Sequence, residues 1–260
     1  MAPTRLLVEE RRRKILDRLQ DNGRVTVDEL VKLFRVSTVT IRGDLDALEK
    51  TGALVRSHGG ALQQRPSDGD MAITVKATLH RAEKARIGRR AVELVREGDT
   101  VILDSGSTTA EVARHIRGAR FQSLTVITNA LNIAVEMAKL PSVRLVMLGG
   151  VLRPLSFSLV DPRGESLLSD MSADTLFLGV DGIDPATGLT TFDPLEARLN
   201  AAMVKAARQV VVVADSSKFG RRGIAHIAGI DCVDTVITDG GIDRPTRKAL
   251  EKKGVAVVVV

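Results

Sequence analysis

The spacing of apolar residues near the start of the chain predicts two short helices separated by a turn. Ile15, Leu16 and Leu19 fall on one side of a charged helix within 9–20, and the sequence DNG ends that helix. A Thr-x-x-Glu capping box at 26–29 then begins a second helix, and an apolar stripe follows it. The second helix therefore follows the first after a short turn.

A third helix is predicted over 36–48, with the sequence VSTVTIRGDLDAL. Ile41, Leu45 and Leu48 are spaced i, i+4 and i+7, which puts them on one face, and Ser37 can cap the helix start. A glycine stands inside this helix, where it costs about 1 kcal/mol relative to alanine. The opposite face of the helix does not enter the core and is available to contact a partner.

The stretch ALVRSHGGAL at 53–62 is partly β-branched with paired glycines, which predicts a small hairpin. Three helices and a hairpin in this order make a winged helix-turn-helix, whose second helix of the turn lies in the major groove of duplex DNA. Arg42 would bind either a guanine edge or a phosphate, and the wing would meet the DNA backbone. A solvated surface helix is the alternative. The residues predicted to contact DNA are Ser37, Thr38, Val39, Thr40, Arg42, Gly43, Arg56 and His58.

The chain changes character after a polar stretch. Residues 63–75, QQRPSDGDMAITV, contain Pro and Gly without a helical or strand period, which predicts a linker. Beyond it, Val/Ile/Leu runs such as TVILD, QVVVVA and VAVVVV alternate with helix-like segments, which is typical of parallel strands covered on both faces. We therefore predict an α/β protein: a winged helix-turn-helix domain at 1–62, a linker at 63–75, and a larger, mostly parallel α/β domain at 76–260.

One predicted strand-to-helix junction carries a cluster of small polar residues. In VILDSGSTTAEVARHI, an apolar strand leads through Asp104 and the stretch 105–109 into a helix. Backbone N–H groups and hydroxyls at such a junction can hold a phosphate, and the helix dipole favours negative charge there. The Gly-Lys-Ser/Thr of a P-loop is missing, and an ordinary Ser/Thr-capped turn is the alternative.

Other predicted strands also end in polar residues or glycines. Because ligands of open parallel sheets bind at the carboxyl ends of the strands, these residues are expected to converge on one site. For Asp181 and Lys218, a turn residue and a solvated lysine are the alternative interpretations. The residues predicted to bind a phosphorylated effector are Asp104, Ser105, Gly106, Ser107, Thr108, Thr109, Thr128, Asn129, Gly149, Gly150, Asp181 and Lys218.

Composition narrows the choice of partners. The 38 basic and 32 acidic residues give a net charge of +6 and a pI near 9.8, which favours an anionic partner. Trp and Tyr are absent, so duplex DNA is favoured over single strands, whose bases stack on aromatic rings. With one cysteine, Cys232, and four scattered histidines, no disulfide, metal or cofactor is expected. The absence of a signal peptide or long apolar run predicts a soluble, cytoplasmic protein without a membrane partner.

Two sets of motifs make the chain similar to the DeoR family of bacterial sugar-metabolism regulators. The stretch from RRKILDRLQ through VSTVTIRGDLDAL to VRSHGGAL resembles the family's N-terminal domain, although Gly43 departs from the usual Thr-Ile-Arg-Arg-Asp-Leu. EKARIGRRAVELVREGDTVILDSGSTT, TVITN, LGG, DGIDPATGLTT, DSSKFG and VITD resemble, in this order, its sensor domain. This likeness implies a fold similar to ribose-5-phosphate isomerase and a response to phosphorylated sugars. VSTVTIR, and EARLN at 196–200, resemble in particular the branch controlling N-acetylgalactosamine use, which implies an amino-sugar phosphate.

These observations predict a DNA-binding repressor of sugar or amino-sugar catabolic genes that a phosphorylated sugar releases from its operator. A single winged head offers few base contacts, so a homo-oligomer is expected. The alternative is a sugar-phosphate isomerase or deaminase that uses Asp104, Asp181 and Lys218 as candidate groups. The DNA-reading head, and the lack of a clear second catalytic carboxylate beside DGID, favour a regulator over an enzyme. An oligomerising scaffold is a third interpretation.

Overall fold

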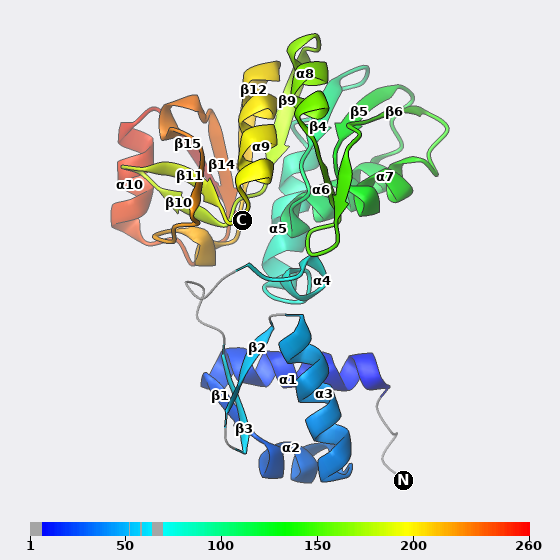
Figure 1. The fold of residues 1–260 in the computed structure, drawn as a ribbon. Helices are drawn as coiled ribbons and strands as arrows, with labels where there is room; N and C mark the ends of the chain where they lie inside the picture. The colour runs from blue at the N-terminus through cyan, green and yellow to red at the C-terminus, as the bar shows by residue number, and fades with distance from the viewer. Residues whose placement is uncertain (1–6, 52, 58, 64–69) are drawn as a thin grey trace. The chain divides into compact units, whose positions relative to one another are not determined.

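The computed structural model describes residues 7–51, 53–57, 59–63 and 70–260 (Figure 1). The chain forms two compact units, Met1–Leu79 and His80–Val260. Within the described residues, no helix combines the length and the apolar character needed to cross a bilayer.

The first unit is a small helical head with an antiparallel sheet. Its helices are α1 (Val8–Asn22), α2 (Val27–Phe34), α3 (Thr38–Lys50) and the short α4 (Ile73–Lys76). Its strands, paired in the order β1-β3-β2, are β1 (Arg24–Thr26), β2 (Leu54–Ser57) and β3 (Gly60–Gln63). The predicted winged helix-turn-helix is confirmed.

Side-chain caps set where two of these helices begin. The Thr26 hydroxyl accepts a hydrogen bond from the Glu29 N–H at 3.3 Å, and the Glu29 carboxylate accepts one from the Thr26 N–H at 2.9 Å. The Ser37 hydroxyl accepts one from the Thr40 N–H at 3.1 Å. The apolar faces of the helices then meet in a core that includes Ile15, Leu19, Leu30, Ile41 and Leu45.

The predicted linker at 63–75 contains some regular structure. Helix α4 occupies its last residues, with Ile73 and Val75 buried, and the Ala72 N–H donates to the Thr51 carbonyl at 3.3 Å. Residues 64–69 lie outside the described ranges. A helix of four residues is too short to show a period in the sequence, which is why it was not predicted.

The second unit is built on a seven-stranded parallel sheet in the order β15-β14-β12-β9-β4-β5-β6. All six strand pairs are parallel, as predicted. The strands are β4 (Thr100–Leu103), β5 (Leu124–Thr128), β6 (Val143–Met147), β9 (Ala173–Leu178), β12 (Ala207–Val213), β14 (Thr235–Thr238) and β15 (Ala256–Val259).

Helices cover both faces of this sheet (Figure 1). They are α5 (Arg81–Val92), α6 (Ser107–Ala119), α7 (Leu131–Met137), α8 (Pro162–Ser169), α9 (Pro194–Ala206) and α10 (Arg244–Lys252), with 3-10 turns at η1 (Ser216–Lys218) and η2 (Ile230–Cys232). Two small antiparallel sheets complete the unit: β7 (Val151–Arg153) with β8 (Ser158–Val160), and β10 (Gly182–Asp184), β11 (Gly188–Thr191) and β13 (Ala225–Ala228).

Successive residues of the central strands enter different hydrophobic cores. On β4, Ile102 packs with residues of α8, α9 and α10, whereas Val101 and Leu103 pack with residues of α5, α6 and α7. Burial on both faces explains the continuous apolar runs in the sequence.

The chain reverses its direction across the sheet between β4 and β9. From β4 it proceeds through β5 to β6, and from β9 it proceeds through β12 and β14 to β15. Ligands of open α/β sheets bind at the carboxyl ends of the strands beside such a reversal. The loops after β4 and β9 are therefore where a ligand is expected.

Candidate functional site

Helix α3 has an outward face that the core of the head does not use. Thr38, Val39, Arg42 and Gly43 are exposed, Thr40 is half-buried, and the N-cap serine is exposed as well. These residues occupy the first two turns of the helix. The structure therefore presents the predicted contact residues of α3 together on the surface.

Asp44 follows these residues but points into the head. Its carboxylate accepts hydrogen bonds from Arg11 Nε at 2.5 Å and Arg12 Nε at 3.1 Å, and both Asp44 and Arg11 are buried. Breaking a buried charge pair leaves one charge without compensation, so the contact is costly to disturb. It fixes α3 against α1 and so sets how α3 is presented.

The wing residue Arg56 makes its contacts inside the head. Its guanidinium donates to the Gly60 carbonyl at 2.7 Å and lies 3.2 Å from Asp46 Oδ1 on α3. The side chain thus joins the hairpin to α3. The other predicted wing contact, His58, lies outside the described residues.

In the second unit, the loop after β4 enters α6 at Gly106, an N-cap without a side chain. Asp104 Oδ1 accepts hydrogen bonds from the Gly106 N–H, at 3.1 Å, and from the Thr109 hydroxyl. Ser105 and Thr108 are buried, and Ser107 is half-buried. No serine or threonine caps the helix, so its first N–H groups stay available in the way that suits an anion.

Asp104 is a buried carboxyl at the centre of this loop. Burial raises its pKa to about 6, although hydrogen bonds from Thr109, Gly179 and Gly106 act in the opposite direction. A Cβ on Gly106 would lie 3.1 Å from the Cα of Gly179. The loops after β4 and β9 are therefore in close contact, which the two glycines favour.

The loops after β9 and β12 bring two predicted residues together. Asp181 accepts a hydrogen bond from the Thr191 hydroxyl at 3.0 Å, and its other oxygen lies 3.7 Å from Lys218 Nζ. Both side chains are largely buried. Neither is a solvated loop residue.

A second buried ion pair beside them was not predicted from the sequence. Lys84 Nζ on α5 lies 3.9 Å from Asp215 Oδ2, and both side chains are almost fully buried. Burial acts to raise the pKa of Asp215, but Lys84 and Lys218 outweigh it and hold the pKa below its usual value. Burial lowers the pKa of the half-buried Arg221, and the charges of Asp215 and Asp181 act in the opposite direction. Each of the two carboxylates thus has a lysine beside it, and Arg221 is close enough to feel both charges.

The residues after β5 and β6 have different environments. Thr128 is buried and accepts from the Ala130 N–H at 3.1 Å, whereas buried Asn129 donates to the Leu159 carbonyl at 3.3 Å. Gly149 and Gly150 are exposed where the chain turns into β7, and a Cβ on Gly150 would lie 2.8 Å from the Val160 backbone. Gly150 thus serves the hairpin.

Three buried polar atoms near the carboxyl ends of strands have no hydrogen-bond partner among the described residues. They are Asn129 Oδ1 after β5, Asp215 Oδ2 after β12 and Thr238 Oγ1 at the end of β14. Buried polar atoms are rarely left without a hydrogen bond, so each calls for an explanation.

A network of charged and hydroxyl side chains on the β7–β8 hairpin was also not predicted from the sequence. Arg153 Nε lies 2.9 Å from Asp193 Oδ2, and the buried Glu196 accepts a hydrogen bond from the Ser158 hydroxyl at 2.6 Å. The charge of Glu196 is one of the influences that raise the pKa of Asp104. The network therefore acts on the same edge of the sheet, and its one signal in the sequence was the motif EARLN.

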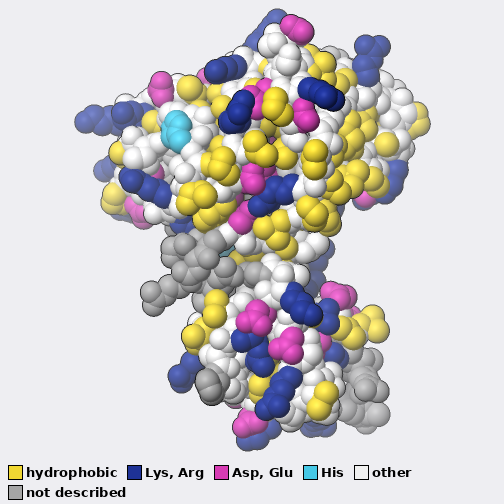
Figure 2. Space-filling view, in the orientation of Figure 1, with side chains coloured by type: hydrophobic (Ala, Val, Ile, Leu, Met, Phe, Trp, Pro, Cys, Tyr) yellow, Lys and Arg dark blue, Asp and Glu magenta, His cyan; other side chains and the backbone are white. Residues whose placement is uncertain are grey.

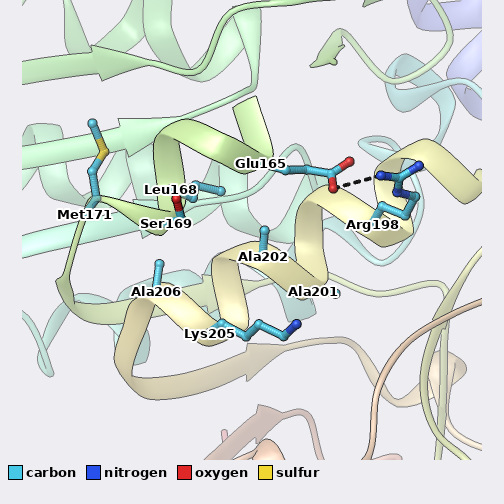
Figure 3. A pocket seen from close by; sticks show the side chains of 9 residues that line it. All are labelled: Glu165, Leu168, Ser169, Met171, Arg198, Ala201, Ala202, Lys205 and Ala206. Atoms are coloured by element: carbon cyan, nitrogen blue, oxygen red, sulfur yellow. Dashed lines mark hydrogen bonds and ion pairs between the residues drawn. The ribbon is translucent and has the colours of Figure 1, made fainter. Parts of the chain in front are cut away.

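A surface pocket of about 510 Å³ lies elsewhere, between α8 and α9 (Figure 3). Leu168, Ala202 and Ala206 line it, and an ion pair of 3.1 Å between Glu165 and Arg198 crosses one end. It contains none of the predicted site residues. Within the described ranges, no group of three His, Cys, Asp or Glu side chains is placed to hold a metal ion.

Comparison with known proteins finds a different domain in each part of the chain. Residues 11–66 match the DeoR-like helix-turn-helix domain, and residues 79–240 match the DeoR C terminal sensor domain. A putative aga operon transcriptional repressor from Escherichia coli O157:H7 is 41% identical over 96% of this chain and 93% of its own length. The glycerol-3-phosphate regulon repressor from Escherichia coli K12 is 34% identical over 88% of this chain and 90% of its own.

Among solved structures, ribose 5-phosphate isomerase A from Methanocaldococcus jannaschii is 20% identical, covering 52% of this chain and 53% of that chain with a TM-score of 0.37. The two matching domain models and the full-length relatives confirm the resemblance seen in the sequence. The chain belongs to the DeoR family of transcriptional regulators.

Proposed function

We propose that the protein represses sugar or amino-sugar catabolic genes in the cytoplasm and leaves its operator when a phosphorylated sugar binds the second unit. Residues 1–62 would bind DNA and 76–260 the effector, with 63–75 as the linker. The names of the relatives support a repressor, since they include an aga operon and a glycerol-3-phosphate regulon repressor.

The effector half of the proposal rests on one arrangement at the carboxyl edge of the sheet. The uncapped start of α6 lies beside the reversal point, and the loops after β9 and β12 carry the cations Lys218 and Arg221, with Lys84 of α5 beside Asp215. Anions bind where helix N–H groups and cationic side chains meet. Asn129 Oδ1 and Thr238 Oγ1, which have no hydrogen-bond partner among the described residues, would pair with the hydroxyl groups of a sugar.

A titration of paired ligands tests this site. Calorimetry with free and phosphorylated hexoses and hexosamines should show tight binding of the phosphorylated forms and very weak binding of the free sugars. Lys218→Gln and Thr108→Leu should abolish the response to effector without loss of operator binding. Lys253→Gln, an exposed lysine at the end of α10, is the matched control. Equal affinity for the free and phosphorylated sugars would contradict the proposal.

One observation supports an enzyme as the second candidate function. A buried carboxyl with a pKa near 6, as at Asp104, is suited to proton transfer near neutral pH. Asp104 Oδ1 already accepts hydrogen bonds from Thr109 and Gly106, and Asp181 Oδ2 accepts one from Thr191. We therefore expect purified protein to leave hexose phosphates unchanged, and measurable isomerisation or ammonia release would favour the enzyme.

We also propose that the protein acts as a homo-oligomer, which would present more than one head to the operator. On the face of the second unit shown in Figure 2, hydrophobic side chains gather among charged ones. Val135 on α7 and Val151 on β7 are 52% and 71% exposed. Analytical ultracentrifugation would test this, and a monomer at operator-binding concentrations would contradict it.

A further inference from the structure

Val39 does not contribute to the stability of the head in either of the usual ways. It is 79% exposed, more than any other large hydrophobic residue described in the first unit, and it lies in the first turn of α3. A β-branched residue also has a lower helix propensity than alanine. Neither burial nor helix formation accounts for a valine here.

Gly43 stands one turn further along the same helix. A helical side chain leans toward the N-terminus and covers the turn before its own Cα, so a side chain at 43 would lie over Val39. A Cβ added at Gly43 would meet nothing within 4 Å, so the head has room for one. The glycine is not required by packing, and its effect is to leave Val39 uncovered.

We propose that Val39, uncovered by Gly43, contacts the 5-methyl group of a thymine in the operator. This inference rests on the proposed DNA-binding function. In the major groove, the thymine methyl is the apolar group by which a base pair is recognised, and small apolar side chains contact it. The bare backbone at Gly43 lets the base edge approach the valine closely.

The neighbouring Arg42 makes this contact useful for specificity. It is exposed on the same two turns of α3 and can hydrogen-bond a guanine edge or a phosphate. The rigid attachment of α3 through Asp44 to Arg11 and Arg12 keeps the valine in a fixed position. A hydrogen-bonding arginine and an apolar valine would then read different base pairs.

The experiment removes the methyl group from each side of the contact in turn. Duplexes bound by the full-length protein are selected from a random pool, and each thymine of the selected site is replaced by deoxyuridine, which keeps its hydrogen-bonding groups. At fixed salt, such a replacement at the contacted thymine should weaken binding by about fourfold for each half-site in which it is made, the effect of one buried methyl-sized group.

Protein variants identify the residue that reads the methyl. Val39→Ala should weaken binding to the thymine duplex by a similar factor and lose its sensitivity to that deoxyuridine. Gly43→Gln, which covers Val39, should also lose the sensitivity. Ile224→Ala, at an exposed isoleucine of the second unit, should keep the behaviour of the wild type.

Two results would overturn the thymine contact alone. One is a wild type indifferent to every deoxyuridine while Arg42→Ala still weakens binding. The other is a Val39→Ala variant that stays as sensitive as the wild type. If no duplex is selected at all, the proposed DNA-binding function fails and this inference fails with it.

Discussion

Asp104 shows how one buried residue sets a pH dependence. Its pKa of about 6 in the folded protein exceeds the ordinary value of 3.8 because the carboxyl is buried. Between these values the folded state binds more protons than the unfolded chain, so the free energy of unfolding falls as pH rises. The stabilising contribution is complete below about pH 4 and is lost above about pH 6.

Asp104→Asn should therefore stabilise the second unit at pH 7.5 and have little effect at pH 4. The amide keeps an acceptor for Gly106 and Thr109 but carries no charge, and the gain should approach roughly 3 kcal/mol. Urea unfolding of both proteins across this range is the measurement. Asp184→Asn is the control, because the Thr187 N–H lowers the pKa of Asp184 and its loss should destabilise. A gain that does not change with pH would contradict the account.

Arg42→Ala should weaken operator binding by roughly 1 to 3 kcal/mol and leave the fold intact, because the side chain is exposed on α3. Gel-shift titration at several salt concentrations separates the two possible partners. Loss of a phosphate contact reduces the salt dependence by about one charge, whereas loss of a guanine contact relaxes the preference at one base pair. Arg208→Ala, at an exposed arginine of the second unit, is the control. Unchanged affinity for Arg42→Ala would mean that α3 does not face DNA.

At the scale of elements, the wing is held to α3 by Arg56 rather than left to reach outward. The guanidinium bridges Asp46 on α3 and the Gly60 carbonyl on β3. Such half-exposed contacts are individually weak, but together they fix the angle of a short hairpin. We therefore expect Arg56 to act on DNA binding by positioning the wing.

Arg56→Ala should cost about 1 kcal/mol of stability in the head and leave the salt dependence of operator binding close to that of the wild type. Thermal unfolding followed by circular dichroism gives the first quantity, and gel shifts at several salt concentrations give the second. Arg56→Lys keeps the charge but not the two-sided geometry, so it should behave like the alanine variant. A reduction of the salt dependence by one charge would instead identify a phosphate contact.

Elements with strong local signals could be predicted from the sequence. The Thr26 and Ser37 caps and the apolar stripes marked α2 and α3, and doubly buried runs marked the parallel strands. The hairpins β7–β8 and β10–β11 were not predicted, because their short strands carry neither an alternating nor a continuous apolar pattern. Lys84 and Glu196 were missed for another reason: charged residues on helices usually face solvent, and only the tertiary fold buries these two.

At the scale of the whole molecule, the proposed function requires the two units to be coupled. An effector can shift operator binding only by the difference in its own affinity for the two states of the protein. In the proposed site, the cations near Lys218 would bind the effector tightly, but tight binding alone does not shift an equilibrium between two states. What matters is whether operator-bound protein binds the phosphorylated sugar less well.

Such coupling is reciprocal, which supplies the last prediction. If the phosphorylated sugar weakens operator binding by about 5- to 150-fold, the operator must weaken sugar binding by the same factor. Calorimetric titration of the sugar into protein alone, and into protein saturated with operator duplex, measures one side, and gel shifts with and without sugar measure the other. Lys218→Gln should remove both effects together, because it removes the ligand. If the fold-changes in operator affinity and in sugar affinity were unequal, the sugar and the duplex would compete through something other than a shared equilibrium of this protein. If neither affinity changed, the bound sugar would not be the signal.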